Sequence, residues 1–355
     1  MEPFAPGKPP LFVPSAFVDY ACERSLLCCE HPVRAPVPRA DRPRMLGLLA
    51  RTGPGRLIAE TLAERVTHEW PGSAEPVWRQ RDGRCVNLAG SASRDAASLD
   101  TAARACELHA AAGLEALPSS CRNYPRWVTE LPDRTEVAFS LTCPTAARLL
   151  ATSRAPWALV PLHDDAWPYA ATLRVAGDVP LTVDRHAPLA DVLALREAWW
   201  AALDAAREDP GALLATLARM AHAPLDPGAS ATPPLDRELA GGVAQTALSA
   251  LERLPDRAAY TSVRWEVFAE LAQPMSARAL DLATDPVAAP LARFASHGLQ
   301  WVGVHDPRPV DAMMRIVVRR ALLVVRLVDA LCARVPYPLS TLVRDTFCAA
   351  SYIDA

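Results

Sequence analysis

Lysine is almost absent from this chain of 355 residues. Lys8 is the single lysine among 37 basic residues, and the other 36 are arginine. With 40 acidic residues the net charge is −3, so the protein has no large positive field that would attract phosphate. We therefore expect no nucleic-acid partner. Glycine is also scarce, at 15 residues, whereas proline is frequent, at 34, which predicts turns set by proline.

The sequence also lacks a long apolar run without charges. Its most apolar stretch, residues 313–335, contains five arginines and one aspartate, too many charges for a membrane-spanning helix. The N-terminal segment has prolines where a signal peptide needs a continuous apolar segment. We expect a cytoplasmic protein with no membrane partner. Its thiols would be reduced, so a cysteine cluster indicates metal binding or catalysis rather than a disulfide framework.

The nine cysteines are the most informative residues, and seven of them lie within the first 143 positions. Six candidate ligands come from four separate segments: Cys22, Cys28, Cys29, Cys85, Cys106 and Cys121. Four thiolates suit either zinc or an iron–sulfur cluster, because soft sulfur ligands stabilise both. The C-x2-C-x2-C run of ferredoxins and paired C-x2-C zinc knuckles are both missing. Spacing therefore predicts a metal site without choosing the metal, and buried cysteines without a metal are the alternative.

The remaining cysteines have different surroundings. Cys143 directly precedes Pro144 at an expected helix N-terminus, where the helix dipole stabilises a thiolate. A metal ligand, a reactive thiol and a buried cap are all compatible with that position. Cys332 and Cys348 lie in apolar helical segments, and we predict that both are core residues.

Hydrophobic periodicity predicts an α+β protein that is predominantly helical. We expect two regions: a cysteine-rich, metal-binding region over residues 1–155 with short antiparallel hairpins, and a mainly helical region over 156–355. In the first region helices are expected over 44–51, 56–68, 98–113 and 144–152, and hairpins over 77–88 and 126–141. Gly53-Pro54-Gly55 is expected to separate the first two helices. In the second region helices are expected over 188–208, 210–221, 235–254, 257–272, 287–299, 309–335 and 338–350.

The order of several short motifs resembles one protein family. The motifs are Cys22-x5-Cys28-Cys29, Cys106 followed by Leu108-His109 and Gly113, the stretch CRNYPR from Cys121 to Arg126, and CPTAARL from Cys143 to Leu149. Together they cover about residues 15–155. In this order they resemble the flagellin lysine-N-methylase proteins, which belong to a wider cysteine-cluster group of iron- or zinc-chelating proteins.

The resemblance implies a [4Fe–4S] cluster and methyl transfer from S-adenosylmethionine to lysine side chains of a protein substrate, which in that family is flagellin. Arg122 and Arg126 lie beside Cys121 and are candidate cofactor-binding residues. Their guanidinium groups would donate hydrogen bonds to cluster sulfur or to a ligand carboxylate. From the residues alone, a structural ion pair is the alternative for both arginines.

The sequence does not locate the site of the methyl donor. A glycine-rich loop after a first strand, as in Rossmann-type methylases, is not visible, and the C-x3-C-x2-C triad of radical enzymes is missing as well. We hypothesise that the cluster region binds S-adenosylmethionine. The alternative hypothesis is a non-catalytic zinc- or iron-binding protein that acts as a partner-binding or redox module.

Overall fold

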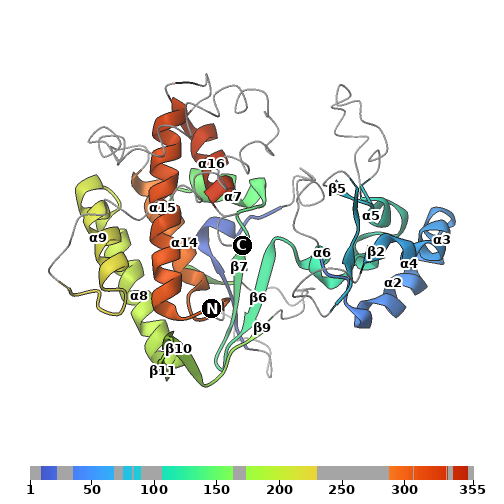
Figure 1. Cartoon of the computed structure of the whole chain (residues 1–355), viewed down its shortest axis with the longest axis horizontal. Coiled ribbons are helices and arrows are strands. Elements are labelled where there is room, and N and C mark those ends of the chain that lie inside the picture. Colours follow the sequence, from blue (N-terminus) through green and yellow to red (C-terminus); the bar gives the residue numbers. More distant parts are fainter. Residues whose placement is uncertain are drawn as a thin grey trace. The chain divides into compact units, whose positions relative to one another are not determined.

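The computed structural model describes residues 9–21, 35–67, 75–81, 84–88, 106–162, 173–229, 288–306, 308–332, 334 and 339–350. Two compact units make up the chain (Figure 1). Unit 1 consists of Met1–Ala21, Pro125–Ala166 and Ala171–Ala355, and unit 2 consists of Cys22–Tyr124 and Trp167–Ala170. Along the chain the units change at residues 21/22, 124/125, 166/167 and 170/171, whereas the boundary expected from the sequence was residue 155.

Unit 1 is organised around a five-stranded mixed sheet of order β8-β1-β7-β6-β9. Its strands are β1 (Leu11–Pro14), β6 (Arg126–Glu130), β7 (Thr135–Phe139), β8 (Leu159–Leu162) and β9 (Leu173–Arg174). β6 and β7 form an antiparallel hairpin in which Thr129 lies opposite Glu136. β1 runs parallel to β7 and antiparallel to β8, and β9 runs parallel to β6. The hairpin expected over 126–141 is therefore confirmed.

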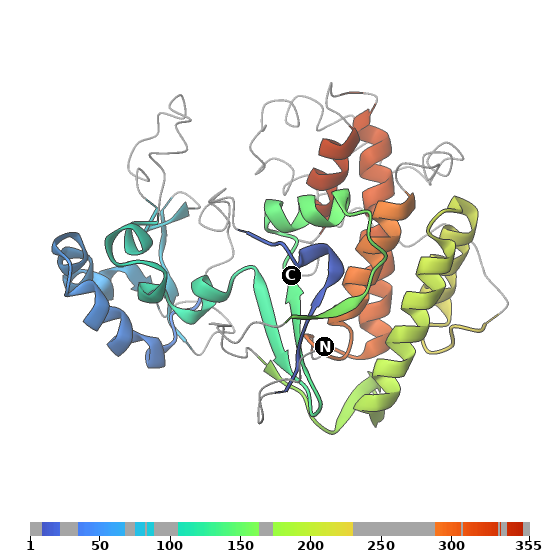
Figure 2. The ribbon, with the colours of Figure 1, turned by 180° about the vertical axis from the view of Figure 1, so that it is seen from behind.

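Helices cover this sheet. They are α7 (Pro144–Thr152), α8 (Leu189–Ala206), α9 (Pro210–His222), α14 (Ala288–Trp301), α15 (Val310–Cys332) and α16 (Leu339–Ala350). Figures 1 and 2 show α8, α9, α14 and α15 gathered on the same side of β6 and β7. A short hairpin of β10 (Asp178–Thr182) and β11 (Arg185–Pro188) leads into α8. Because α14 packs against β7, α7, α8 and α15, it joins the sheet to the helical layer.

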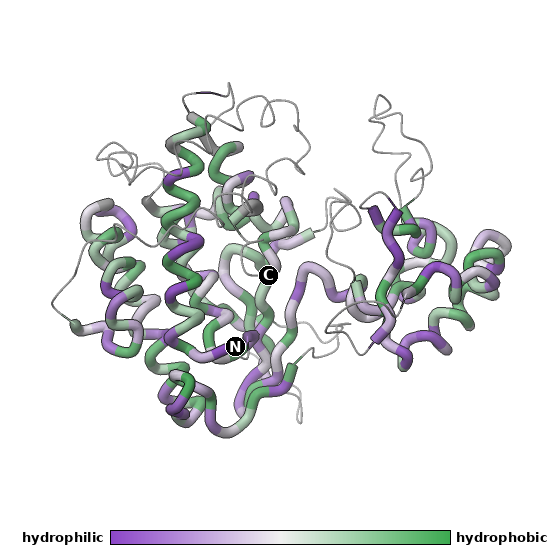
Figure 3. The backbone as a smooth tube through the Cα atoms, in the orientation of Figure 1, coloured by the Kyte–Doolittle hydropathy of each residue, from purple (hydrophilic) through white to green (hydrophobic). Residues whose placement is uncertain are grey.

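Two predicted helices of unit 1 are confirmed closely. α7 begins at Pro144, which the first turn tolerates because no intrahelical N–H bond is required there. α15 combines hydrophobic and hydrophilic positions along its length (Figure 3), and Val318, Leu322 and Val325 on it are at most 1% exposed. It is thus an amphipathic core helix, as the arginines in the apolar run indicated. Among the helices that the structure describes, none combines the length and the apolar character needed to cross a membrane.

Unit 2 is assembled from short elements. Its helical segments are η2 (Arg39–Asp41), α2 (Arg42–Leu49), α3 (Gly53–Glu60), α4 (Leu62–Arg65), α5 (Glu107–Ala112), η3 (Leu114–Ala116) and α6 (Ser119–Asn123). Its strands form two antiparallel pairs, β2 (Val66–Thr67) with β3 (Val77–Trp78) and β4 (Gln80–Arg81) with β5 (Arg84–Cys85). An antiparallel pair is present within the expected hairpin 77–88, but β4 and β5 form it, whereas β3 pairs with β2.

The glycine-proline motif of unit 2 has a different role from the one predicted. Gly53-Pro54-Gly55 forms the first turn of α3 and does not break a helix. Thr52 caps this turn, because its Oγ1 accepts a hydrogen bond from the Gly55 amide at 3.1 Å. A Cβ at position 55 would clash with the Leu49 carbonyl oxygen and with Thr52 Oγ1, so only glycine fits there. The single helix predicted over 56–68 was also wrong, since β2 follows α4.

The broad fold class, α+β with extensive helix and short antiparallel hairpins, is confirmed by these elements. The helix expected over 98–113 was wrong at residue 106, because Cys106 has an extended backbone and pairs with Leu88, so that α5 begins at Glu107 and ends at the C-cap Gly113, whose φ is 80°. Residues 98–105 lie outside the described residues. Left-handed φ values favour glycine, as the predicted helix stop required. The helices expected over 235–254 and 257–272 lie outside the described residues.

Candidate metal centre

Two of the predicted ligands, Cys85 and Cys106, lie on neighbouring segments of unit 2. Leu88 and Cys106 form an isolated antiparallel bridge, and the Glu107 amide donates to the Asn87 carbonyl oxygen at 2.8 Å. The Leu88 amide in turn donates to the Cys85 carbonyl oxygen at 3.0 Å. These bonds join the chain around Cys85 to the start of α5, although 20 residues separate the two cysteines in sequence.

The side chains of Asn87 and Arg65 support this junction. Asn87 is 1% exposed, and its Nδ2 group approaches Cys85 Sγ at 3.8 Å. Arg65 Nη1 donates to Asn87 Oδ1 at 2.9 Å and to Glu107 Oε2 at 2.7 Å. Because Arg65 occupies the amide oxygen of Asn87, the amide NH2 group is turned toward sulfur. Neither Arg65 nor Asn87 was predicted from the sequence, in which the position of Asn87, two residues after Cys85, was the available signal.

Cys121 occupies a third segment, the short helix α6. The preceding hydroxyl, Ser120 Oγ, donates to the Pro36 carbonyl oxygen at 2.5 Å and lies 3.9 Å from Cys121 Sγ. At the start of α6, the Ser119 amide donates to Asp41 Oδ2 at 2.7 Å. This contact helps to keep the pKa of Asp41 low against the opposing effect of burial. α6 is thereby tied to the segment that leads into α2.

All three described candidate ligands pack against one hydrophobic core, and each is partly exposed. That core consists of Val37, Met45, Leu49, Ile58, Leu62, Val66, Trp78, Leu108, Ala116 and Leu117. Partial exposure distinguishes these cysteines from fully buried structural cysteines. Three segments that are distant in sequence thus pack against the same hydrophobic core.

The other predicted ligands, Cys22, Cys28 and Cys29, lie outside the described residues. Within the described part of the chain, no three His, Cys, Asp or Glu side chains are grouped closely enough to hold a metal ion. Cys85, Cys106 and Cys121 therefore do not form a complete site by themselves. His109 is exposed on α5, and Cys106 is the N-cap residue of that helix.

The two candidate arginines belong to different units. Arg122, in unit 2, forms an ion pair with Glu115 at 2.7 Å, which is the structural alternative considered for it. Its Nε group is nevertheless buried and has no hydrogen-bond partner among the described residues. Arg126, in unit 1, places its guanidinium 4.6 Å from the ring centroid of Tyr20 and 5.7 Å from that of Phe139. Cation–π contact is its described role.

The donor set fits a thiolate-bound metal. Sulfur in such a site carries negative charge and accepts N–H hydrogen bonds that orient and tune it. Asn87 Nδ2 already faces Cys85 Sγ, and the buried Arg122 Nε group, next to Cys121 in sequence, is available to a sulfur acceptor. The cysteines supply soft ligands, so the chemistry of this part of unit 2 suits zinc and iron–sulfur clusters alike.

Cys143 lies in unit 1 and is the N-cap residue of α7, as predicted from Pro144. It is 5% exposed, and its Sγ lies 3.5 Å from the Tyr20 hydroxyl. This environment supports the interpretation of a buried cap. The side chains of Cys332 and Cys348 lie outside the described part of the chain.

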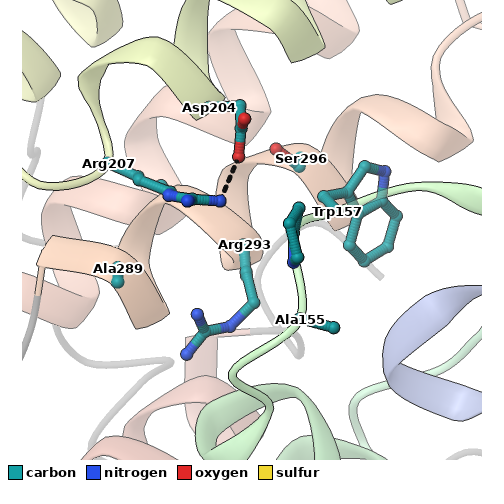
Figure 4. Close-up of a pocket in the computed structure, with 9 residues that line it drawn as sticks. Ala155, Trp157, Asp204, Arg207, Ala289, Arg293 and Ser296 are labelled. Carbon is teal, nitrogen blue, oxygen red and sulfur yellow. Dashed lines mark hydrogen bonds and ion pairs between the residues drawn. The ribbon is translucent and has the colours of Figure 1, made fainter.

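A small hollow in unit 1 is too small for the methyl donor. Trp157, Asp204, Arg207, Arg293 and Ser296 line it (Figure 4), and its volume of about 10 Å³ has room for one water molecule. The Asp204–Arg207 ion pair at 2.8 Å closes one side. Arg293 donates to the carbonyl oxygens at the end of α7, and burial, together with the charge of Arg207, lowers its pKa to about 10. This hollow does not accommodate S-adenosylmethionine.

Comparisons with known proteins add no relative. No protein-family model, no curated protein and no solved structure matches the chain.

Proposed function

We propose that the chain is an iron–sulfur-cluster-dependent protein lysine N-methyltransferase and that unit 2 holds its cluster. The observation that carries the proposal is the packing of Cys85, Cys106 and Cys121, from three separate segments, against one hydrophobic core. The resemblance to flagellin lysine-N-methylases supports the choice of cluster and reaction. Cys22, Cys28 and Cys29 complete the proposed set of ligands, and four of the six thiolates are enough for a [4Fe–4S] cluster.

Residues of unit 2 would prepare the cysteines for ligation. Arg65 and Glu107 fix Asn87 so that an N–H group faces the sulfur of Cys85. Arg122 would direct its buried Nε–H to a sulfur atom and retain its ion pair with Glu115. When bound, the cluster supplies a one-electron centre and a covalent connection between the segments. The hydrogen bonds favour the deprotonated form of the thiols.

The proposed reaction balances without an added oxidant. The bond between the methyl carbon and the sulfonium sulfur of S-adenosylmethionine breaks, and a bond from this carbon to lysine Nζ forms. S-adenosylhomocysteine leaves with the electron pair, and the attacking amine loses one proton to solvent. The substrate would be a protein with surface lysines, flagellin being the first to test, and the protein would act in the cytoplasm.

Metal content after anaerobic purification tests the ligand set. We expect a brown protein that absorbs near 400 nm, as thiolate-bound iron–sulfur centres do, and that contains iron and sulfide. Cys85→Ser, Cys106→Ser and Cys121→Ser variants are each expected to lose part of this iron. Cys143→Ser is the matched control because Cys143 lies in unit 1, and its iron content should equal that of the wild type. Equal iron content in all four variants would reject the proposed ligands.

Mass spectrometry of flagellin incubated with the cluster-loaded protein and S-adenosylmethionine tests the reaction. We expect mass increases of one or more methyl groups on lysines. Self-methylation on side chains is confined to Lys8, the single lysine of the chain, so the background is low. If every offered lysine remains unmodified while the cluster is intact, the methyltransferase proposal is wrong.

A zinc- or iron-binding module without catalysis is the second candidate. It is favoured by the sulfur-rich environment of unit 2, which suits a structural metal as well as a cluster. A colourless protein that contains one zinc ion per chain, and no sulfide, would select this candidate over the first.

A further inference from the structure

A group of buried polar side chains lies in unit 1, away from the cysteines. Thr129, Glu136 and Gln300 are 0% exposed, Arg196 is 2% exposed and His305 is 7% exposed. They come from β6, β7, α8, α14 and the turn that follows α14. Buried polar groups of this kind are stable only where hydrogen bonds replace those made with water. Each polar atom of this group therefore needs a hydrogen-bond partner.

The strand register brings these side chains together. Thr129 and Glu136 lie directly opposite each other in the β6–β7 hairpin, so both project from the same face of the sheet. His305 Nδ1 lies 2.6 Å from Thr129 Oγ1. Arg196 donates to both carboxylate oxygens of Glu136, at 2.7 and 2.9 Å. Gln300 Nε2 donates to the Val137 carbonyl oxygen at 3.0 Å, one residue along the same strand.

Three polar atoms of this group lack a hydrogen-bond partner among the described residues. Arg196 Nε, Gln300 Oε1 and His305 Nε2 are buried and have no hydrogen-bond partner in the described part of the chain. They comprise a donor, an acceptor and a ring nitrogen that can be either. Each unsatisfied atom costs roughly 1–3 kcal/mol, and three such costs are large beside the stability of a typical domain.

We propose that ordered internal water binds between the β6–β7 hairpin, α8 and α14 and completes the hydrogen bonding of Arg196 Nε, Gln300 Oε1 and His305 Nε2. Water fits this set because it accepts from the guanidinium and donates to the amide oxygen, and buried waters typically make about three such bonds. The Trp200 ring lies 4.6 Å from the Arg196 guanidinium, and the Trp301 ring lies 5.5 Å from His305. These rings flank the charged group and the imidazole.

The bound water has a structural consequence. Arg196 Nη1 already lies 3.4 Å from the Gln300 carbonyl oxygen, so α8 and α14 meet beside the Glu136 ion pair. Water at the three unpartnered atoms adds a further hydrogen-bonded link to those that Arg196 and Trp200 already make from α8 to carbonyl oxygens of α14. It therefore fixes the position of α14, the helix that joins the sheet to the helical layer.

A crystal structure of the full chain at about 1.5 Å resolution tests the proposal directly. We expect water density within hydrogen-bond distance of at least two of the three atoms. If the three atoms instead bond directly to protein groups, or if the density shows no water near them, the proposal is wrong. This outcome does not depend on whether any variant folds.

Counting long-lived waters by ¹⁷O relaxation dispersion provides a second test in solution. The Gln300→Met variant, which removes the Oε1 acceptor and the Nε2 donor to Val137 at similar volume, is expected to lose at least one long-lived water. Thr346→Val is the matched control, because Thr346 is also fully buried but bonds the Val343 carbonyl oxygen of its own helix. Its water count should not change. Equal counts in the wild type and in folded Gln300→Met would overturn the proposal.

Discussion

Units 1 and 2 are stabilised in different ways. The longest helix described in unit 1 is α15, with 23 residues, whereas α2 and α3 in unit 2 have eight residues each. The strands of unit 2 have only two residues each. Its hydrophobic core consists of ten buried residues among those described. Short elements bury little apolar surface per residue ordered, so they contribute little net stability on their own.

The ion pairs of the two units also differ in burial, and the pair of unit 1 is the more buried. In unit 1 the side chains of Glu136 and Arg196 are 0% and 1% exposed. In unit 2 the side chains of the Arg65–Glu107 pair are 18% and 37% exposed, and solvent screens such a pair to less than about 1 kcal/mol. Unit 1 is therefore stabilised by its buried core, whereas the core of unit 2 is small, and under the proposed function a bound metal would add to its stability.

Removal of the metal is expected to have the largest effect. Under the proposed function, oxidative loss of the cluster followed by chelation should abolish the cooperative unfolding of unit 2, because its small core alone does not offset the entropy of ordering. The backbone amides of unit 1 should remain protected from hydrogen exchange. Hydrogen exchange followed by mass spectrometry measures both: peptides from 42–60 and 107–123 should exchange rapidly, and peptides from α8 and α15 should not.

The opposite exchange pattern would contradict this division of roles. If unit 2 retains its protection after all metal has been removed, its core is sufficient to keep it folded, and the two units do not differ in their dependence on metal. The Cys143→Ser variant with its metal bound is the control, since it alters a cysteine of unit 1 and should leave the exchange of unit 2 unchanged.

Breaking the buried ion pair of unit 1 should have the next largest effect. The Glu136→Gln variant leaves the Arg196 guanidinium buried without a countercharge, which costs roughly 3–5 kcal/mol. Urea unfolding followed by the fluorescence of Trp199 and Trp200 on α8 measures this loss. In the double variant Glu136→Gln/Arg196→Met the buried charge is gone as well, and we expect it to be more stable than Glu136→Gln alone. A single variant as stable as the wild type would show that the pair is unimportant.

The sequence predicted the elements of unit 1 better than those of unit 2. Pro144, the alternation in 126–141 and the periodicity of 309–335 are local signals, and β6, β7, α7 and α15 follow them. In unit 2 the glycine-proline motif was misinterpreted, because whether it begins or ends a helix depends on the close approach of Leu49 to Gly55. The buried group around Glu136 was missed entirely. Its members are spread from Thr129 to His305, and only strand register and helix packing bring them together.

For the candidate site, the sequence indicated the cysteines but not the residues that form hydrogen bonds around them. Cys85, Cys106 and Cys121 were predicted from their number and order, and the structure collects them on one core. Arg65 and Asn87 were not predicted, because a hydrogen bond between residues 22 positions apart leaves no spacing signal. The assignment of Arg126 and Arg122 to one cofactor rested on proximity in sequence, and the boundary between the units falls between them.

Acid should destabilise unit 1 through two buried histidines. Burial is the main cause that lowers the pKa of His297 to about 4 and that of His305 to about 3. His297 Nε2 also donates to the Phe139 carbonyl oxygen at 2.6 Å, and this bond raises its pKa and opposes part of the lowering. In the unfolded chain both groups titrate near 6.5. The two neutral histidines therefore make their full contribution to the free energy of unfolding above pH 6.5. This contribution decreases as the pH falls toward 4, by roughly 2.7 kcal/mol per pH unit for two protons.

Chemical unfolding of unit 1 at a series of pH values between 7 and 4.5 measures this slope. In a His305→Gln variant the slope should fall to that of one proton, roughly 1.4 kcal/mol per pH unit. Glu136 contributes only at lower pH: burial raises its pKa, but Arg196, His305 and Arg134 together hold it below 4.5, so its stabilising effect is lost as the pH falls below that value. A flat profile between pH 6.5 and 4.5 would contradict the burial of both histidines.

Loss of a helix N-cap should have the smallest effect on stability. Because each unit contains such a cap, the same substitution can be compared between the two units. Thr52 Oγ1 caps α3 in unit 2 by accepting from the Gly55 amide, and Asp209 Oδ1 caps α9 in unit 1 by accepting from the Ala212 amide at 3.0 Å. Alanine at either position should cost about 1 kcal/mol. With metal bound, Thr52→Ala should hardly change the exchange of unit 2, whereas after metal removal it should accelerate exchange throughout 53–60. Asp209→Ala should lower the stability of unit 1 equally in both conditions. If both variants behave alike with and without metal, unit 2 does not depend on the metal for its stability.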